Sequence, residues 1–396
     1  MRKNVSIIFS VLIIMGAFIF WGLTTHQHIS SDLNTVKSDD VKVPYGGASQ
    51  KPLYSDKDFL NRMSPYPVMH DDLQYAIALP GLQGAWSLKA GQASVDKHQL
   101  IKVDTLDPQG IAVSRNEIFI SAYDHAHKAN SVIYVLNKWT GRYIKTLVLQ
   151  YQDHAGGISY DPDHQLLWVA GHNGNDSVLY GIAQSDIDSY DIRSKLPIGY
   201  QQDFTLKTAI NASTVAYYDG ALWVGYFTRT GLGNIQKFAI SGDSNATLMV
   251  GQPVGDKDPS IVAGNKFYES VPELQGISAN TNHVMITSSF SNADSKLVRF
   301  DKGDDGKMTN GMYVTMPPFL EGVNYDGDTD RFYALFESAT PVYRIKTKAV
   351  VDRIVYIDPE TFNKYALPYK ALRNPLGFNL ATKTSQTQNP AWVYHK

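Results

Sequence analysis

Four histidines are the side chains of this sequence whose type and spacing point most directly to metal chemistry. His125 and His127 are two positions apart, so both would face the same way in an extended segment. With His154 or His172, their neutral imidazoles could bind a divalent transition ion. The chain has only eleven histidines, which makes this grouping notable. The ordinary alternative is that loop histidines are solvated or bonded to nearby backbone.

Glu321 and Glu337 are the second candidate set. If the fold brings them together, two carboxylates could hold Ca²⁺ or act as general acid and general base. The alternative is that these glutamates are solvated at the rim of the fold or form an ion pair with Arg229. The candidate metal ligands are therefore Glu321, Glu337, His125 and His127. The candidate catalytic residues are Glu321, Glu337 and His154.

Alternating acids at residues 326–330 also resemble a calcium-binding loop. However, Arg331 stands where the sharp turn of such a loop requires Gly. Two other parts of the chain have a hairpin turn at the equivalent place, and acidic residues are typical of such turns. We therefore interpret residues 326–330 as a turn.

Complete catalytic motifs are absent from the sequence. It contains no G-x-S-x-G, H-E-x-x-H or P-loop pattern. It also contains no Cys, which excludes disulfides and thiolate chemistry. The formal net charge is −2, without the concentrated basic face that a nucleic-acid partner needs. Ligand binding and metal-dependent chemistry remain as the main classes of function.

A sequence repeat must position these candidate residues. Five segments share one order of features: a small or polar residue, often Gly, begins a short apolar strand, and a turn leads to a second apolar strand. A third strand follows in each segment. The first strands begin at Gln109, Gly156, Ser213, Gln275 and Glu321.

The second strands place a bulky residue at one equivalent position in every repeat, which predicts packing between neighbouring sheets. A β-sandwich also has alternating strands and frequent turns, but it does not require the same bulky position five times. The residues at this position are Phe119, Trp168, Trp223, Met285 and Tyr333.

Short four-stranded sheets cannot bury both faces alone, whereas copies packed face to face around an axis can. The repeat therefore predicts an all-β fold, a β-propeller with five readable blades. It leaves room for a sixth blade within residues 75–106 and the C-terminal tail. The last repeat has no obvious fourth strand, and we expect residues 99–105 to supply it and close the ring.

The start of each inner strand and the end of each second strand lie at the same end of a propeller, around the mouth of its channel. This rule selects nine residues as ligand-binding candidates, including the histidines and glutamates above. They are Gln109, Asp124, His125, His127, His154, His172, Gln275, Glu321 and Glu337.

The N-terminal residues predict a membrane anchor. Arg2 and Lys3 precede an apolar run over residues 5–23, which is long enough to cross a bilayer as a helix. The position of these charges predicts a cytoplasmic N-terminus. A cleaved signal peptide or a buried helix is the alternative. The predicted organisation is a cytoplasmic tip and transmembrane signal-anchor at 1–23, a polar spacer at 24–74, and the propeller with a C-terminal tail at 75–396.

The segments DPQGIAV at residues 107–113, SVIYVL at 131–136 and TGRYI at 140–144 resemble NHL-type and YncE-like propeller repeats. They also resemble the six-bladed gluconolactonase and paraoxonase group. The likeness covers roughly residues 100–360 and concerns blade architecture. The gluconolactonase-like resemblance implies a calcium ion in the central channel, held by Glu, Asn and Asp side chains from several blades.

Binding is favoured over catalysis as the function, because an anchored repeat scaffold carries no complete catalytic motif. The expected protein is a single-pass cell-membrane protein whose extracytoplasmic propeller binds a small molecule, a glycan or a partner protein. The alternative is a calcium-dependent, lactonase-like or esterase-like hydrolase with its site in the channel mouth. A purely structural envelope component is the third hypothesis.

Overall fold

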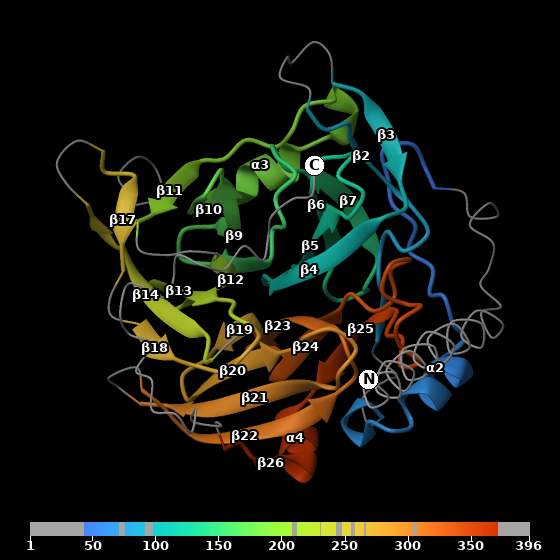
Figure 1. The fold of residues 1–396 in the computed structure, drawn as a ribbon. Coiled ribbons are helices and arrows are strands. Elements are labelled where there is room, and N and C mark those ends of the chain that lie inside the picture. The colour runs from blue at the N-terminus through green and yellow to red at the C-terminus, as the bar shows by residue number, and fades with distance from the viewer. Residues whose placement is uncertain are drawn as a thin grey trace, which may run out of the picture.

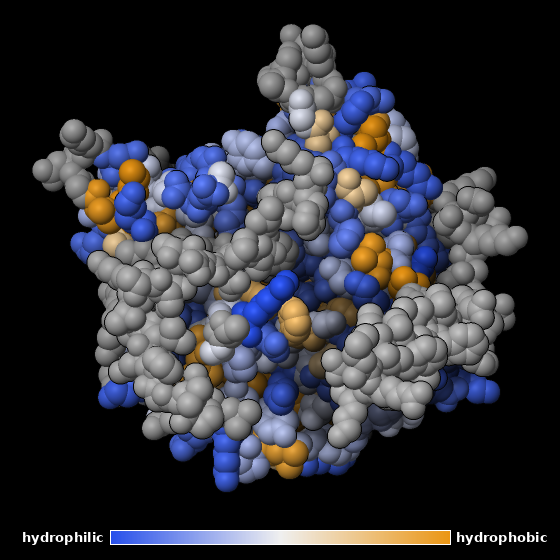
Figure 2. Space-filling view, viewed as in Figure 1, coloured by the Kyte–Doolittle hydropathy of each residue, from blue (hydrophilic) through white to orange (hydrophobic). Residues whose placement is uncertain are grey.

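The computed structural model describes residues 43–70, 76–91, 98–207, 212–229, 231–242, 248–254, 258–264, 267–303 and 307–370. The predicted transmembrane segment at 1–23 lies outside these residues, as does most of the predicted tail. Among the described helices, none is long and apolar enough to cross a membrane. In Figure 2, the apolar residues of the face in view lie in small groups among polar ones.

Five sheets, each built on antiparallel neighbouring strands except for the parallel pair β11–β17 in one of them, are arranged around a common centre, as Figure 1 shows. Each inner strand contacts the inner strands of the two neighbouring sheets, so the five form a closed ring. The inner strands are β4 (Leu106–Val113), β8 (Gly157–Asp161), β12 (Ala212–Tyr218), β19 (Leu274–Ala279) and β23 (Leu320–Asp326). The predicted β-propeller is therefore confirmed, with five blades.

The second and third strands follow the sequence repeat. The second strands are β5 (Glu117–Asp124), β9 (Leu166–Asn173), β13 (Ala221–Tyr226), β20 (His283–Ser288) and β24 (Arg331–Phe336). The third strands are β6 (Val132–Asn137), β10 (Asp176–Ala183), β14 (Asn234–Ser241), β21 (Ser295–Lys302) and β25 (Arg353–Ile357).

The outer strands are less regular than the inner ones. They are β7 (Tyr143–Val148), β11 (Gln202–Leu206), β15 (Met249–Val250), β22 (Met308–Met316) and β1 (Ile77–Ala78). Short additional strands extend three blades: β16 (Gln252–Pro253) and β17 (Ile261–Ala263) in blade two, β18 (Phe267–Glu269) in blade three, and β26 (Leu367–Pro368) in blade four. Helices α3 (Gln184–Ser189) and α4 (Pro359–Tyr365) and the 3-10 turn η5 (Ile192–Ser194) lie in the connections.

The bulky residues at the equivalent position of the second strands pack between neighbouring blades, as the sequence predicts. Phe119 lies in one core cluster with residues of blade two, and Trp168 packs with residues of blade three. Trp223 and Met285 continue this pattern into blades four and five. Tyr333 of blade five packs against blade one, which completes the circle. The inter-blade core thus repeats the sequence period.

Close approach of the inner strands explains one glycine at the start of a repeat. A Cβ atom on Gly157 of β8 would collide with the backbone of Thr214 in β12. Only Gly lets the two strands lie this close.

The ring is closed by a strand from the N-terminal side of the domain, but not by the one predicted. β1 pairs with β25, so Ile77 and Ala78 supply the fourth strand of blade five. Residues 99–105 instead contribute β3 (Leu100–Val103), which pairs with β2 (Ala85–Leu88) in a separate two-stranded sheet. The expectations for residues 99–105 and for a sixth blade in this region were therefore wrong. Two-residue pairing leaves too short a pattern to recognise in the sequence.

Part of the predicted spacer belongs to the folded domain. Helix α2 (Asp56–Met63) and the 3-10 turn η2 (Pro67–Met69) lie beside blade five, as Figure 1 shows for α2. Phe59 and Met63 are spaced on one face of α2 and are buried in the core between blades four and five. Residues 43–70 thus pack on the propeller, because a few apolar side chains in a polar segment are enough to dock it.

Asp352 fixes this N-terminal segment to the closing blade. Its buried carboxylate accepts hydrogen bonds from the backbone N–H groups of Leu53 and Tyr54, at 2.6 and 2.9 Å. Arg353 Nε donates to the same carboxylate at 3.1 Å. Arg353 also forms an ion pair with Asp56 and donates to the Tyr54 carbonyl. These contacts tie the segment before β1 to β25.

We expect Asp352→Ala to lower the free energy of unfolding by about 3–5 kcal/mol, because it leaves two backbone N–H groups without their acceptor and removes one of the acceptors of the buried Arg353 guanidinium. Chemical denaturation of the full-length chain measures the change. Asp191→Ala, which breaks an exposed ion pair with Arg193 and the side-chain cap of η5, is the matched control and should lower the stability far less than Asp352→Ala does. Equal stability of the Asp352→Ala variant and the wild type would refute this role of Asp352.

Candidate functional site

Strand order places most of the candidate residues at one end of the ring. In each blade the inner strand begins, and the second strand ends, at the same end, because the two are antiparallel. The register shows this directly in blade one, where Asp107 at the start of β4 lies opposite Tyr123 at the end of β5. We call this end the mouth of the propeller.

Three buried carboxyl groups meet at the mouth where blade five adjoins blade one. Asp107, Glu321 and Glu337 are 0%, 6% and 8% exposed. Gln109 Nε2 donates to Glu337 Oε2 at 3.1 Å. The carboxyl groups of Glu321 and Glu337 interact directly in this buried position. Two buried carboxyl groups that interact favour a state in which one of them carries a proton.

Burial and mutual repulsion favour this protonated state. Burial raises the pKa of Glu321 to about 8, and the charge of Asp107 contributes. Burial also raises the pKa of Glu337 well above its ordinary value, with repulsion from Glu321 and Asp107 as further causes. Among the described residues, neither glutamate forms an ion pair with Lys or Arg. Arg229 lies over the ring of Phe290 instead.

Aromatic side chains surround the carboxyl groups. The Tyr123 ring lies 4.4 Å from the imidazole of His154, and the Tyr343 ring packs edge-on against the imidazole of His125, with 5.9 Å between ring centres. His125 Nδ1 lies 2.8 Å from Asp107 Oδ2. This hydrogen bond raises the pKa of His125. The second oxygen of Asp107, Oδ1, is buried without a hydrogen-bond partner among the described residues.

The mouth cluster is defined by seven residues that these contacts connect. They are Asp107, Gln109, Tyr123, His125, Glu321, Glu337 and Tyr343. Four of them were ligand-binding candidates from the sequence. Asp107, Tyr123 and Tyr343 were not. The position of Asp107, two residues before Gln109 at the start of an inner strand, could have indicated it, whereas Tyr343 lies in a loop that no other repeat shares.

His154 and His172 are held neutral beside the cluster. Burial lowers the pKa of His154 to about 3, with the charges of His172, His125 and His127 as further causes. Burial also lowers the pKa of His172, whose Nε2 has no partner among the described residues. Burial raises the pKa of the neighbouring Asp153 to about 7. Neutral imidazoles suit hydrogen bonding to a ligand.

Other candidate residues lie in the loops of the mouth or form hydrogen bonds within them. The carboxylate of Asp124 accepts hydrogen bonds from the backbone N–H groups of Ala126, Lys128 and Ala129, which shapes the loop after β5. His125 and His127 lie in this turn, where His127 has a φ of 52°. The extended arrangement expected for this pair is therefore absent. Gln275 Nε2 donates to the carbonyl of Ser289 within blade four.

Metal binding stays a prediction. No group of three or more His, Cys, Asp or Glu side chains in the described ranges is arranged to hold a metal ion. Residues 326–330 form the turn that the sequence indicated. Lys138 Nζ lies 2.8 Å from Asp326 Oδ1 and 2.8 Å from Asp328 Oδ2, so both acids pair with a lysine rather than with a metal ion.

Comparisons with known proteins do not assign the chain to a family. No family model matches the chain, and no curated protein sequence matches it. The following solved structures are similar to the chain at low scores. A GH43 glycoside hydrolase has a TM-score of 0.41 at 8% identity, over 59% of this chain and 49% of that one. The WD40 repeats of RRP9 reach 0.34 at 12% identity, over 69% and 97%.

A putative oxidoreductase (glucose dehydrogenase) from Thermus thermophilus reaches a TM-score of 0.35 at 11% identity. The match covers 63% of this chain and 96% of that one. Likenesses this low support no argument about function, so the functional argument depends on the geometry of the mouth.

The raised pKa of Glu321 predicts a pH-dependent stability. Because its pKa rises from 4.5 to about 8 on folding, the folded state binds more protons between these values. The free energy of unfolding should therefore fall as the pH rises through this window, by up to about 1.4 kcal/mol per unit. Glu321→Gln should reduce this slope and leave the part that the raised pKa values of Glu337 and Asp153 contribute. Denaturation between pH 7.5 and 8 measures it best, because the unfolded-state titration of His154, centred near 6.5, is then largely complete.

Glu360→Gln, on the exposed side of α4, is the control and should keep the wild-type slope. Identical slopes for wild type and Glu321→Gln would show that Glu321 does not titrate in this window.

Proposed function

We propose that this chain is a ligand-binding propeller whose mouth recognises a protonated amine. The observation that carries the proposal is the buried Glu321–Glu337 pair. These carboxyl groups have no Lys or Arg counter-ion among the described residues, and they avoid the cost of two buried charges by sharing a proton. An ammonium group supplies the missing charge and replaces that proton.

The surrounding groups match an ammonium ion. Its three N–H donors need several acceptors in different directions, which Glu321, Glu337 and the unpartnered Oδ1 of Asp107 offer. The aromatic rings of Tyr123 and Tyr343 offer cation–π contacts. Lys346 already places its ammonium 4.5 Å from the ring centre of Tyr343, so the protein uses the same contact internally.

The same geometry argues against acid–base catalysis by these residues. Two carboxyl groups that flank a scissile glycosidic bond stand well apart, whereas those of Glu321 and Glu337 are buried and interact directly with each other. His154, with a pKa of about 3, is too weak a base to accept a proton near neutral pH. Binding therefore fits the site better than the predicted hydrolase.

This proposal retains the predicted location and the predicted kinds of partner. With residues 1–23 as a signal-anchor, the mouth would be displayed outside the cell membrane, where amino sugars of glycans and amino groups of proteins are available. Calcium is the competing ligand, because the same carboxyl groups would attract it.

We expect glucosamine to bind the full-length chain, and N-acetylglucosamine, its uncharged analogue, to bind at least tenfold more weakly. Glu337→Gln should weaken glucosamine binding at least tenfold by removing one acceptor charge. Isothermal titration calorimetry measures both effects. Glu269→Gln, an exposed change at the edge of blade three, is the control and should bind as the wild type does.

Equal affinity for the charged and uncharged sugars would refute amine recognition. Binding of Ca²⁺ that glucosamine cannot displace, lost in Glu337→Gln, would replace the proposal with the calcium site.

A further inference from the structure

The loop that follows β24 brings a lysine to the mouth of the propeller. The loop begins at Glu337, whose carbonyl accepts a hydrogen bond from the backbone N–H of Thr340 at 3.1 Å. The Thr340 carbonyl accepts from the N–H of Tyr343 at 3.2 Å, and the Tyr343 carbonyl accepts from the N–H of Lys346 at 2.8 Å. These successive turns lead from the buried pair of glutamates to Lys346 and fix the lysine relative to the mouth cluster.

The ammonium group of Lys346 lies beside two members of the mouth cluster. Its Nζ is 4.5 Å from the centre of the Tyr343 ring, which packs edge-on against the imidazole of His125. The hydrogen bond to Asp107 raises the pKa of His125, and the charge of Lys346 opposes this rise. The ammonium group and the imidazole are therefore close enough to interact electrostatically.

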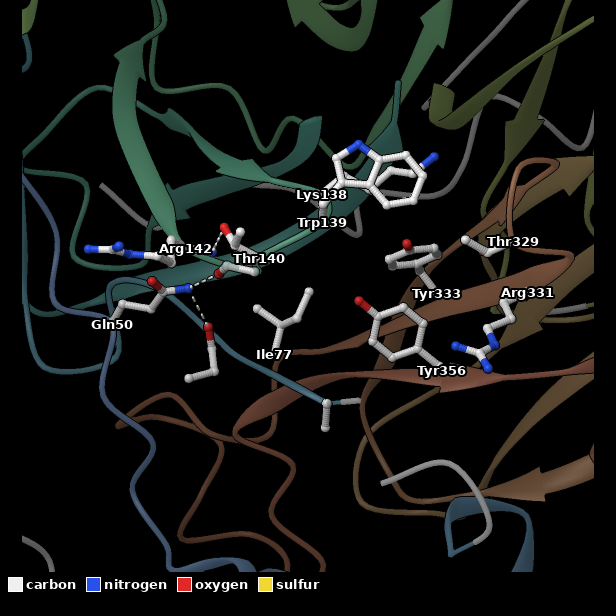
Figure 3. A pocket seen from close by; sticks show the side chains of 13 residues that line it. Gln50, Ile77, Lys138, Trp139, Thr140, Arg142, Thr329, Arg331, Tyr333 and Tyr356 are labelled. Carbon is white, nitrogen blue, oxygen red and sulfur yellow. Dashed lines mark hydrogen bonds between the residues drawn. The ribbon is translucent and has the colours of Figure 1, made fainter. Parts of the chain in front are cut away.

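Lys346 forms no ion pair with an acid of the described residues. The lysine in the wall of the cavity that Figure 3 shows, at the end of the ring opposite the mouth, differs in this respect. The Lys138 side chain is 1% exposed, and its Nζ pairs with both Asp326 and Asp328. Lys346 is exposed instead, so its charge can be reached by a ligand.

The carboxyl groups nearest to His125 have other partners. Asp124 accepts hydrogen bonds from three backbone N–H groups of its own loop and from the hydroxyl group of Thr105. Asp107 directs its Oδ2 to the Nδ1 of His125, at 2.8 Å. The mouth thus has acidic groups in its interior and, at its rim, the ammonium group of Lys346 without a carboxylate partner among the described residues.

We infer that the ligand of the mouth is a zwitterion: an amino acid whose ammonium group binds at Glu321 and Glu337 and whose carboxylate binds the ammonium group of Lys346. This inference rests on the proposed amine recognition and names the class of amine. An ammonium–carboxylate contact is a charge-assisted hydrogen bond. The acidic groups of the mouth repel a carboxylate that no cation receives, so Lys346 determines whether an amine with a carboxylate is accepted.

The test uses the full-length chain and three amino acids of increasing length: glycine, 4-aminobutanoate and 6-aminohexanoate. Each is compared with its primary amide, which keeps the ammonium group and the length of the molecule but has no carboxylate charge. At least one amino acid should bind at least tenfold more tightly than its amide in isothermal titration calorimetry. The length that binds best reports the separation of the two charged groups.

A single variant isolates the contribution of the lysine. Lys346→Gln removes the charge at an exposed position, so it should abolish the preference for the amino acid and leave the affinity for the amide unchanged. Lys302→Gln is the matched control, because Lys302 Nζ also lies over a tyrosine ring, 4.2 Å from the centre of Tyr218. It lies at the end of the ring opposite the mouth and should keep the wild-type preference.

Three results would overturn the inference and leave amine recognition standing. They are binding of the amides with no preference for any amino acid, a preference that persists in Lys346→Gln, and tighter binding of the amides to Lys346→Gln, which would show that Lys346 itself occupies the mouth. Binding of none of the six probes at millimolar concentration would instead refute amine recognition at the mouth, and the inference with it.

Discussion

Closure of the ring is the constraint on which the rest of this structure depends. A single four-stranded blade leaves two apolar faces open, and each blade covers one face of the next. The circle is complete only because Tyr333 of blade five packs against blade one and β1 joins β25. The pairing in β1 spans only two residues, so the buried contacts of Asp352 with the segment before it are essential to hold the strand in place.

The proposed amine site lies at this closure. The mouth cluster joins Glu321 and Glu337 of blade five to Gln109 and Asp107 of blade one. A ligand at the mouth would contact residues from the first and the last blade, so ligand binding and ring stability are linked.

The fold could be predicted from the sequence wherever the pattern repeats. The bulky residue recurs in all five second strands, from Phe119 to Tyr333, because each blade makes the same packing contact with the next blade. The closing strand could not be predicted, because Ile77 and Ala78 pair over two residues and carry no period. Helix α2 was also missed, since only Phe59 and Met63 of its eight residues are buried. Site residues could likewise be predicted only where they belong to the repeat. The strand ends indicated Gln109, Glu321 and Glu337, whereas Tyr343 comes from a loop that has no counterpart in the other repeats.

The central claim is that the Glu321–Glu337 pair exchanges its shared proton for the charge of an amine. Calorimetric titration with glucosamine at pH 7, in two buffers of different ionisation enthalpy, measures the protons released on binding. Because a bound ammonium stabilises the carboxylates and lowers their pKa, the account predicts release of roughly one proton per amine, lost in Glu337→Gln. Binding without proton release would contradict it, since the amine would then occupy another site.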